Sequence, residues 1–406
     1  SGVITVTAPN TSTDRTITLP DSTGTLLDTT SGLDATKLSG TLPALNGASL
    51  TGVAGRRNIL INGAMKVAQR GTSTTDGNGY GVDRFRGNVA NMDNLVVALT
   101  QNSVTDLPQF TKSLKVTTNT AESAIAANEY YRVFQQIESQ DCQQFAYGTS
   151  SAKSVTISFW VKSSITGTYA LSVYADASAG TRIIGGTYAI GSANTWEKKT
   201  ITLAGDTGRV MDNDNTEGFR INWIMAAGTD YTSANNTSWG AYASNKLAYG
   251  QGTNAVITTA NATWEVTGVQ LELGSVATDF EHRSYGEELA LCKRYFYLPA
   301  QRDTTHRPIC NVVAASSTEI FGIVLFPVEM RAGPSLASTL SGDSRKYRAN
   351  LGTVNGDGTA NPSIGSSTSY SCRLDWANFS GLTADKAGIV TTGYSSGGYF
   401  GFDAEL

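Results

Sequence analysis

The 406-residue chain is poor in charge and holds no long hydrophobic run. Charged residues make up 16% of it and the formal net charge is −4, whereas roughly 25% charged residues is usual. This balance provides no basic surface for a nucleic acid, so we expect no nucleic-acid partner. No apolar run approaches the roughly eighteen residues that a membrane-spanning helix needs, so we expect no membrane insertion.

Histidine and cysteine are also scarce, which limits metal and redox chemistry. The four cysteines (Cys142, Cys292, Cys310 and Cys372) show no C-x-x-C spacing, so a zinc site is not expected. The segment Met211–Gly218 is similar to a calcium-binding loop but lacks its characteristic glycine and its final glutamate. An acidic turn is the simpler interpretation, and we expect no cofactor.

Catalytic motifs are missing as well. The chain has neither a G-x-S-x-G nucleophile elbow nor a glycine-rich phosphate loop. A glycosidase needs two neighbouring carboxylates, and among 34 acidic residues such a pair arises by chance. We therefore expect that the protein is not an enzyme.

What the chain does contain is many short, alternating apolar segments separated by turns. From Val269 to Leu273 the alternation is strict, which indicates a half-buried strand. Similar segments recur at the spacing of an antiparallel sandwich. The predicted strands are Asn58–Ile61, Leu95–Leu99, Ser113–Val116, Tyr130–Gln136, Val155–Val161, Tyr169–Ala175, Glu197–Leu203, Phe219–Met225 and Glu265–Leu273.

A helix is predicted directly after the last of these strands. Ser284 and Glu287 have the spacing of a capping box. Leu289, Cys292 and Phe296 then fall on one helical face that has no obvious partner within the chain. We expect these three residues to meet their copies at a threefold axis.

The sequence after this helix predicts a smaller β domain. The sequence before the sandwich does not predict a globular domain. The predicted C-terminal strands are Ile320–Phe326, Tyr347–Leu351, Ser371–Asp375, Gly388–Thr391 and Tyr399–Glu405. Residues 1–55 contain only short β-prone pieces and many turns, so one copy cannot bury enough apolar surface to order itself. Two possibilities follow: a flexible linker, or a shaft shared between several chains.

Two sequence signatures carry a resemblance to a known family. The run GVQLELGSVATDFEHRSYGEELALCKRYF resembles the end of a β-sandwich module of bacteriophage tail fibres and related virion proteins. The run RRNILINGAMKVAQRGTST, followed by GYGVDRF, resembles the start of the same module. The resemblance covers residues 56 to 296 and implies a galactose-binding-like jelly roll of the carbohydrate-module type. It does not name a ligand.

The resemblance implies an all-β chain with four parts. These are an N-terminal shaft or attachment segment (1–55), a jelly-roll sandwich (56–283), a linking helix (284–299) and a C-terminal β domain (300–406). The implied protein is a homotrimeric tail fibre that is made in the host cytoplasm, joins the virion through residues 1–55 and binds a host surface glycan. A reducing cytoplasm favours free thiols. A head fibre or decoration protein without a specific receptor, and a depolymerase of surface polysaccharide, remain as alternatives.

The candidate glycan site is the long loop of residues 228–253. Loops of this length without a regular pattern are often functional. Its aromatic and amide residues suit sugar binding, because rings cover the apolar face of a pyranose and amides bind hydroxyl groups. Tyr231, Trp239 and Tyr242 are the predicted ligand contacts, with Trp239 as the main anchor. The alternative is that Trp239 and Tyr242 pack over one end of the sandwich or at a subunit interface. The loop carries one acidic and one basic residue, Asp230 and Lys246, which favours a neutral glycan.

Overall fold

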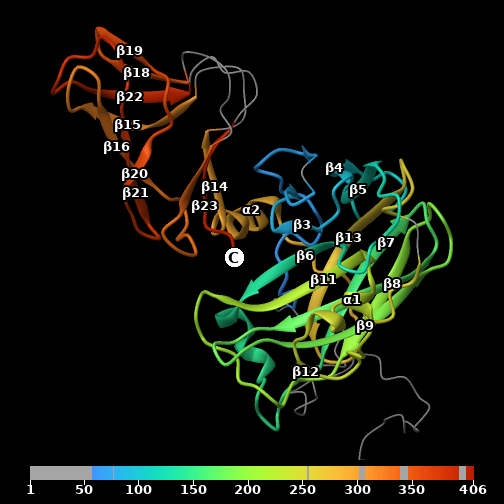
Figure 1. The fold of residues 1–406 in the computed structure, drawn as a ribbon. Coiled ribbons are helices and arrows are strands. Elements are labelled where there is room, and N and C mark those ends of the chain that lie inside the picture. Colours follow the sequence, from blue (N-terminus) through green and yellow to red (C-terminus); the bar gives the residue numbers. More distant parts are fainter. Residues whose placement is uncertain (1–56, 76, 254–255, 301–306, 339–345, 393–398) are drawn as a thin grey trace, which may run out of the picture. The chain divides into compact units, whose positions relative to one another are not determined.

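The computed structural model describes residues 57–75, 77–253, 256–300, 307–338, 346–392 and 399–406. Over these residues the chain is all-β, with antiparallel sheets and few helices (Figure 1). This confirms the predicted fold class. The expected shaft or attachment segment of residues 1–55 lies outside the described residues.

Two sheets form the sandwich. The first, here sheet A, has the strand order β1-β4-β5-β13-β7-β10, and the second, sheet B, has the order β12-β9-β8-β11-β6-β3-β2. Sheet A consists of β1 (Ser73–Thr74), β4 (Val96–Ser103), β5 (Lys112–Thr120), β7 (Val155–Ser163), β10 (Glu197–Leu203) and β13 (Thr263–Leu273). Sheet B consists of β2 (Tyr80–Val82), β3 (Phe85–Ala90), β6 (Tyr130–Glu138), β8 (Gly167–Ala175), β9 (Arg182–Ile190), β11 (Glu217–Ala227) and β12 (Gly240–Ala241).

The period-two alternation of each strand builds the core between the sheets. In β11, Phe219, Ile221 and Trp223 have no exposed surface and belong to the main apolar cluster. Arg220 and Asn222, which alternate with them, point to the other side of sheet B. The outer side of this sheet is therefore free to carry polar and aromatic residues without disturbing the core.

Most of the predicted sandwich strands are confirmed. The predicted strand Tyr130–Gln136 is β6, and the 3₁₀ helix η3 (Ser139–Phe145) follows it. One expectation fails. Residues Asn58–Ile61 form no strand, although the backbone N–H of Ile59 donates to the carbonyl of Leu271. The structure also adds strand β9, which was not predicted and has a glycine pair at its centre.

Helix α2 (Tyr285–Lys293) begins where the capping residue predicts, because the Ser284 hydroxyl accepts from the N–H of Glu287 at 3.2 Å. The helix is shorter than expected, and Phe296 already lies in strand β14 (Phe296–Ala300). Cys292 and Phe296 have no exposed surface within a single chain, whereas Leu289 is partly exposed. Cys292 and Phe296 thus present no surface to another chain, and the expected contact at a threefold axis stays a prediction, with Leu289 as the exposed residue of the three.

The C-terminal strands form two further sheets around a second apolar cluster. Their orders are β14-β23-β17 and β19-β18-β22-β15-β16-β21-β20. The remaining strands are β15 (Pro308–Ala314), β16 (Ile320–Leu325), β17 (Ser335–Ser338), β18 (Tyr347–Leu351), β19 (Val354–Gly358), β20 (Ser363–Ser367), β21 (Ser371–Trp376), β22 (Ala387–Thr392) and β23 (Phe400–Asp403). All five predicted C-terminal strands are present, within a few residues of their expected bounds.

A buried cluster of charges holds the end of the chain. Arg84 forms an ion pair with Glu405, and Arg70 pairs with Glu405 at 3.2 Å and with Asp403 at 3.0 Å. The side chains of Arg84 and Glu405 are 2% and 8% exposed. Burial by itself lowers the pKa of the Arg84 guanidinium, but the Glu405 carboxylate and other anionic groups raise it by more, so the net pKa lies above its usual range.

The four cysteines are free, and Cys142, Cys292 and Cys372 are buried. The prediction of free, mostly buried thiols is confirmed. Burial raises the pKa of Cys310 to about 12 and that of Cys372 to about 11. Within the described ranges, no group of three or more metal-ligating side chains occurs, and no helix has the length and hydropathy of a membrane span.

We predict that Glu405→Gln lowers the free energy of unfolding by about 3 kcal/mol or more, because it leaves two buried guanidinium groups with less compensating charge. Urea or thermal unfolding of the purified protein measures this. Asp375→Asn is the matched control, since Asp375 pairs with Arg373 at 2.8 Å where the two side chains are 34% and 51% exposed. The control should cost about 1 kcal/mol or less. Equal effects of the two variants would contradict the role of the buried cluster.

We also predict slow thiol modification in the native protein at pH 8. The thiolate is the reactive form, so raising the pKa of Cys310 and Cys372 lowers their reactive fraction at least about a hundredfold. A colorimetric thiol reagent should titrate all four cysteines in denaturant and react only slowly without it. Rapid native labelling would show that these thiols are neither buried nor shifted as described.

Candidate functional site

The loop of residues 228–253 lies against the outer side of sheet B. It contains helix α1 (Thr229–Thr232), strand β12 and the 3₁₀ helix η4 (Ser244–Lys246). Leu247 and Ala248 are buried in a small apolar cluster with Ile183 and Ile224 of the sheet. The loop is therefore anchored by its own apolar residues, and this fixes the positions of its aromatic side chains.

The three predicted ligand contacts do not form one site. The Tyr231 ring packs edge-on against Tyr130, with centroids 4.8 Å apart, and the Tyr242 ring packs edge-on against Tyr174 at 5.1 Å. Trp239 instead packs against the sandwich core, and its indole N–H donates to the carbonyl of Ala204 at 2.7 Å. The alternation along β12 explains the separation, because residues 239 and 242 leave the strand on opposite sides.

Tyr231 and Tyr242 border a surface that we call the aromatic–arginine face. It consists of Tyr130, Arg132 and Phe134 on β6, Tyr174 on β8 and Arg220 on β11. The antiparallel register brings these residues together, since Arg220 lies opposite Tyr174 on one side and Gln136 on the other. The guanidinium of Arg132 lies 5.2 Å from the rings of both Tyr130 and Phe134, and that of Arg220 lies 5.0 Å from Phe134.

Hydrogen bonds hold the Arg132 guanidinium in place. It donates to the side-chain oxygens of Asn88 at 3.1 Å, Asn222 at 3.0 Å and Tyr174 at 3.2 Å. All three acceptors are uncharged. Arg220, by contrast, is neutralised by Glu217, to which its Nε donates at 2.7 Å.

Within the described residues, no carboxylate lies within ion-pair distance of Arg132, whose exposed fraction is 8%. A largely buried cation that contacts only neutral acceptors and aromatic rings is costly to folding. Such a cost is typical of a group that serves binding rather than stability.

Tyr174 of this face and Tyr231 at its border stay protonated at neutral pH. Burial raises the pKa of Tyr174, and the Arg132 charge only partly offsets this effect. Burial also raises the pKa of Tyr231. Their hydroxyls can therefore both donate and accept hydrogen bonds. Together the face offers ring edges and faces, phenolic hydroxyls, amides and one unpaired positive charge.

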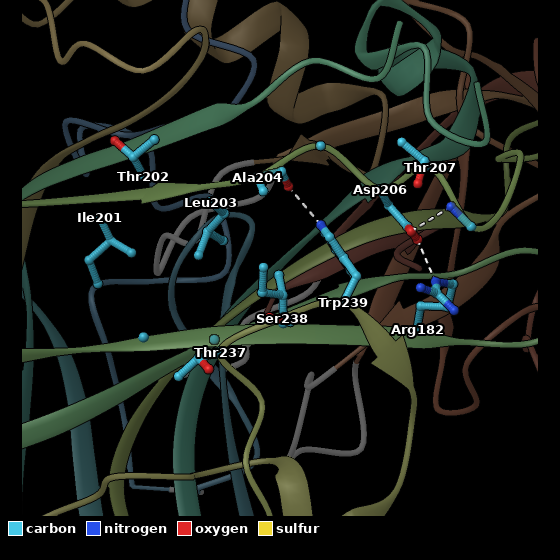
Figure 2. Close-up of a pocket in the computed structure, with 15 residues that line it drawn as sticks. Arg182, Ile201, Thr202, Leu203, Ala204, Asp206, Thr207, Thr237, Ser238 and Trp239 are labelled. Carbon is cyan, nitrogen blue, oxygen red and sulfur yellow. Dashed lines mark hydrogen bonds and ion pairs between the residues drawn. The ribbon is translucent and has the colours of Figure 1, made fainter. Parts of the chain in front are cut away.

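Trp239 lines a separate cavity of about 540 Å³ (Figure 2). It lies between β9 of sheet B and the end of β10 of sheet A. Its lining combines strand residues with the tip of the 228–253 loop. The lining residues are Arg182, Ile184, Gly185, Gly186, Ile201, Thr202, Leu203, Ala204, Gly205, Asp206, Thr207, Gly208, Thr237, Ser238 and Trp239.

Sequence reasoning missed most of the aromatic–arginine face. The signal was present in β6, where Tyr130, Arg132 and Phe134 alternate with core residues at a spacing of two. A strand face that carries rings and guanidinium groups in place of small polar residues is unusual. The partners on β8 and β11 could not have been found in this way, because pairing between strands distant in sequence brings them together.

Comparisons with known proteins leave the family open. No family model matches the chain, and no curated protein matches it. Among solved structures, the enzymatically active domain of tailspike protein 4 of bacteriophage CBA120 aligns over 53% of this chain and 21% of its own length, with 13% identity and a TM-score of 0.29. The match thus spans about a fifth of the tailspike chain.

Two carbohydrate-binding modules align over nearly their full length. The alignment with the family 11 module of a cellulosomal cellulase from Clostridium thermocellum covers 53% of this chain and 99% of the module, with 12% identity and a TM-score of 0.26. The CBM22-2 xylan-binding domain from Paenibacillus barcinonensis covers 50% and 98%, with 13% identity and a TM-score of 0.26. At these TM-scores the similarity assigns neither a family nor a ligand to this chain.

Proposed function

We propose that the protein is a virion fibre component that binds a host surface glycan through the aromatic–arginine face. The observation that carries the proposal is the Arg132 guanidinium, which is preorganised by neutral acceptors among aromatic rings and has no carboxylate partner in the described residues. The sequence signatures that resemble phage tail-fibre modules supply the virion context. We propose that the chain is made in the host cytoplasm and joins the particle through residues 1–55.

The binding mechanism follows from the chemistry of this face. Ring surfaces such as that of the exposed Tyr242 cover the apolar C–H groups of a sugar. Hydroxyl and amide groups select the orientation of the sugar hydroxyls. The protein holds its ligand and performs no reaction on it. Single sugar contacts are weak, so a homotrimer with three faces, and several trimers on each particle, would supply the adhesion through avidity.

The proposed ligand carries an acidic group. The composition of the 228–253 loop favoured a neutral glycan, but the charge of this face comes from Arg132 on β6 and not from the loop. A carboxylate or phosphate on the glycan would pair with Arg132 by charge-assisted hydrogen bonds. This acidic group would supply the negative charge that Arg132 lacks among the described residues.

We predict that Arg132→Gln weakens binding of acidic glycans about tenfold or more while the protein stays folded. The loss of binding follows from the missing charge-assisted contact. The variant removes a largely buried charge but also the donor to Asn88, Asn222 and Tyr174, and these two changes act on the free energy of unfolding in opposite directions. An array of acidic and neutral surface glycans, read with the purified protein, measures the binding, and thermal unfolding measures the stability.

Lys198→Gln is the control for this experiment. It removes the same charge from an exposed position on β10 of sheet A and should leave glycan binding unchanged. Binding to acidic glycans should also weaken as salt is added. An array without any bound glycan would favour a head fibre or decoration protein, and shortening of the polysaccharide would reveal a depolymerase.

The homotrimer remains a proposal, now with Leu289 as the candidate contact. Leu289 is partly exposed and lies near Tyr285, which is 56% exposed. We predict that Leu289→Asp dissociates the trimer, because association would bury an unpaired charge. Sedimentation velocity of the full chain measures the oligomeric state. Ala290→Asp, at the neighbouring exposed position, should remain trimeric, and a trimeric Leu289→Asp variant would place the interface elsewhere.

A further inference from the structure

We infer that the cavity beside Trp239 is a second binding site, which takes one neutral sugar residue. It is distinct from the aromatic–arginine face, because Trp239 and Tyr242 leave β12 on opposite sides. The inference does not rest on the proposed role of Arg132, and each site can fail without the other. The cavity volume of about 540 Å³ lies within the range of small-molecule sites, roughly 300–1,000 Å³.

The position of the cavity follows from the sheet topology. Strand β10 ends sheet A and pairs only with β7 there, and β12 covers β9 only at Arg182 and Ile183. The edges of β9 and β10 beyond these pairings border the cavity. Gly186 of β9 contributes no side chain to its wall, where a Cβ atom would lie 3.3 Å from the side chain of Ile201, another lining residue. A Cβ atom at Gly185 would instead meet the side-chain amide of Asn236.

The charges of the lining cancel. Arg182 and Asp206 are its only charged residues, and the Nε of Arg182 donates to the Asp206 carboxylate at 2.6 Å. The other oxygen of this carboxylate accepts from the N–H of Gly208 at 2.9 Å. Asp206 is 1% exposed. A charged ligand would find no free counter-charge here, in contrast to the situation at Arg132.

The polar groups of the lining suit hydroxyl groups. Thr207 and Ser238 can each donate and accept a hydrogen bond. The Thr202 hydroxyl is instead bound within the protein, 3.0 Å from the Thr156 hydroxyl. The Thr237 hydroxyl already donates to Asn235 at 2.8 Å, which fixes the tip of the loop. An uncharged molecule with many hydroxyls uses such a lining better than an apolar or an ionic ligand does.

Trp239 supplies a rigid apolar wall (Figure 2). Its indole N–H is bound to Ala204, and its ring packs edge-on against Tyr147 with centroids 5.6 Å apart. The protein itself makes both contacts, so its own packing holds this ring in place. A pyranose ring, which has apolar C–H faces and hydroxyls at its rim, matches a fixed indole bordered by hydroxyl groups.

The test uses the full chain and the methyl glycosides of glucose, galactose, mannose and N-acetylglucosamine. Saturation-transfer NMR detects binding, and calorimetric titration gives the affinity. Ser238→Phe fills the mouth of the cavity from an exposed position and should weaken the best probe about tenfold or more. Ser233→Phe places the same bulk at an exposed position of the loop outside the cavity and should have no effect.

Two comparisons complete the experiment. Asp206→Asn frees the Arg182 charge and should shift the preference from a methyl glucoside to glucuronate, provided that its melting temperature shows a folded protein. Arg132→Gln should leave binding of the methyl glycosides unchanged, which separates this site from the aromatic–arginine face. The inference is overturned if no probe binds, or if Ser238→Phe and Ser233→Phe bind the probes equally well.

Discussion

The buried ion cluster of Arg84, Arg70 and Glu405 fixes the C-terminal residues of the described chain against the residues around its first strands. It joins a residue before β1 (Arg70) and one in the turn between β2 and β3 (Arg84) to Glu405, which follows the last strand. The guanidinium of Arg84 also lies 3.4 Å from the ring of Tyr295, just beyond α2. Buried charges tolerate little displacement, because each loses its partner without gaining water. The cluster therefore fixes the register between these segments more sharply than apolar contacts would.

In the sandwich, the alternation of side chains along each strand builds the core on one side of sheet B and a polar, aromatic surface on the other. Inward residues such as Trp223 build the core, while their neighbours on β6, β8 and β11 build the aromatic–arginine face. The same alternation sends Trp239 into the cavity and leaves Tyr242 on the outer side. Two surfaces of different chemistry thus arise from one short loop and one sheet. The aromatic–arginine face carries Arg132, which has no carboxylate partner among the described residues. The cavity carries Arg182, which pairs with Asp206.

Much of the fold could be predicted because alternation is a local property. Strands such as β8 and β18 lie close to their expected bounds, and the Ser284 cap begins α2 as its spacing predicts. The prediction failed where tertiary contacts override the local pattern. Phe296 fits a helical face in the sequence but pairs with Asp403 in a sheet. It had no visible partner in the sequence because that partner lies more than a hundred residues away.

By itself, the sequence determined the all-β class, the free thiols and most strand positions. Composition and period-two alternation act within a few residues, so they can be read directly from the chain. Only the tertiary structure decided which residues share a surface. It separated Trp239 from Tyr231 and Tyr242, and it placed Arg132 among rings with no carboxylate of the described residues as a partner. The physical reason is that strand register and sheet order bring distant segments together, and no local pattern records those pairings.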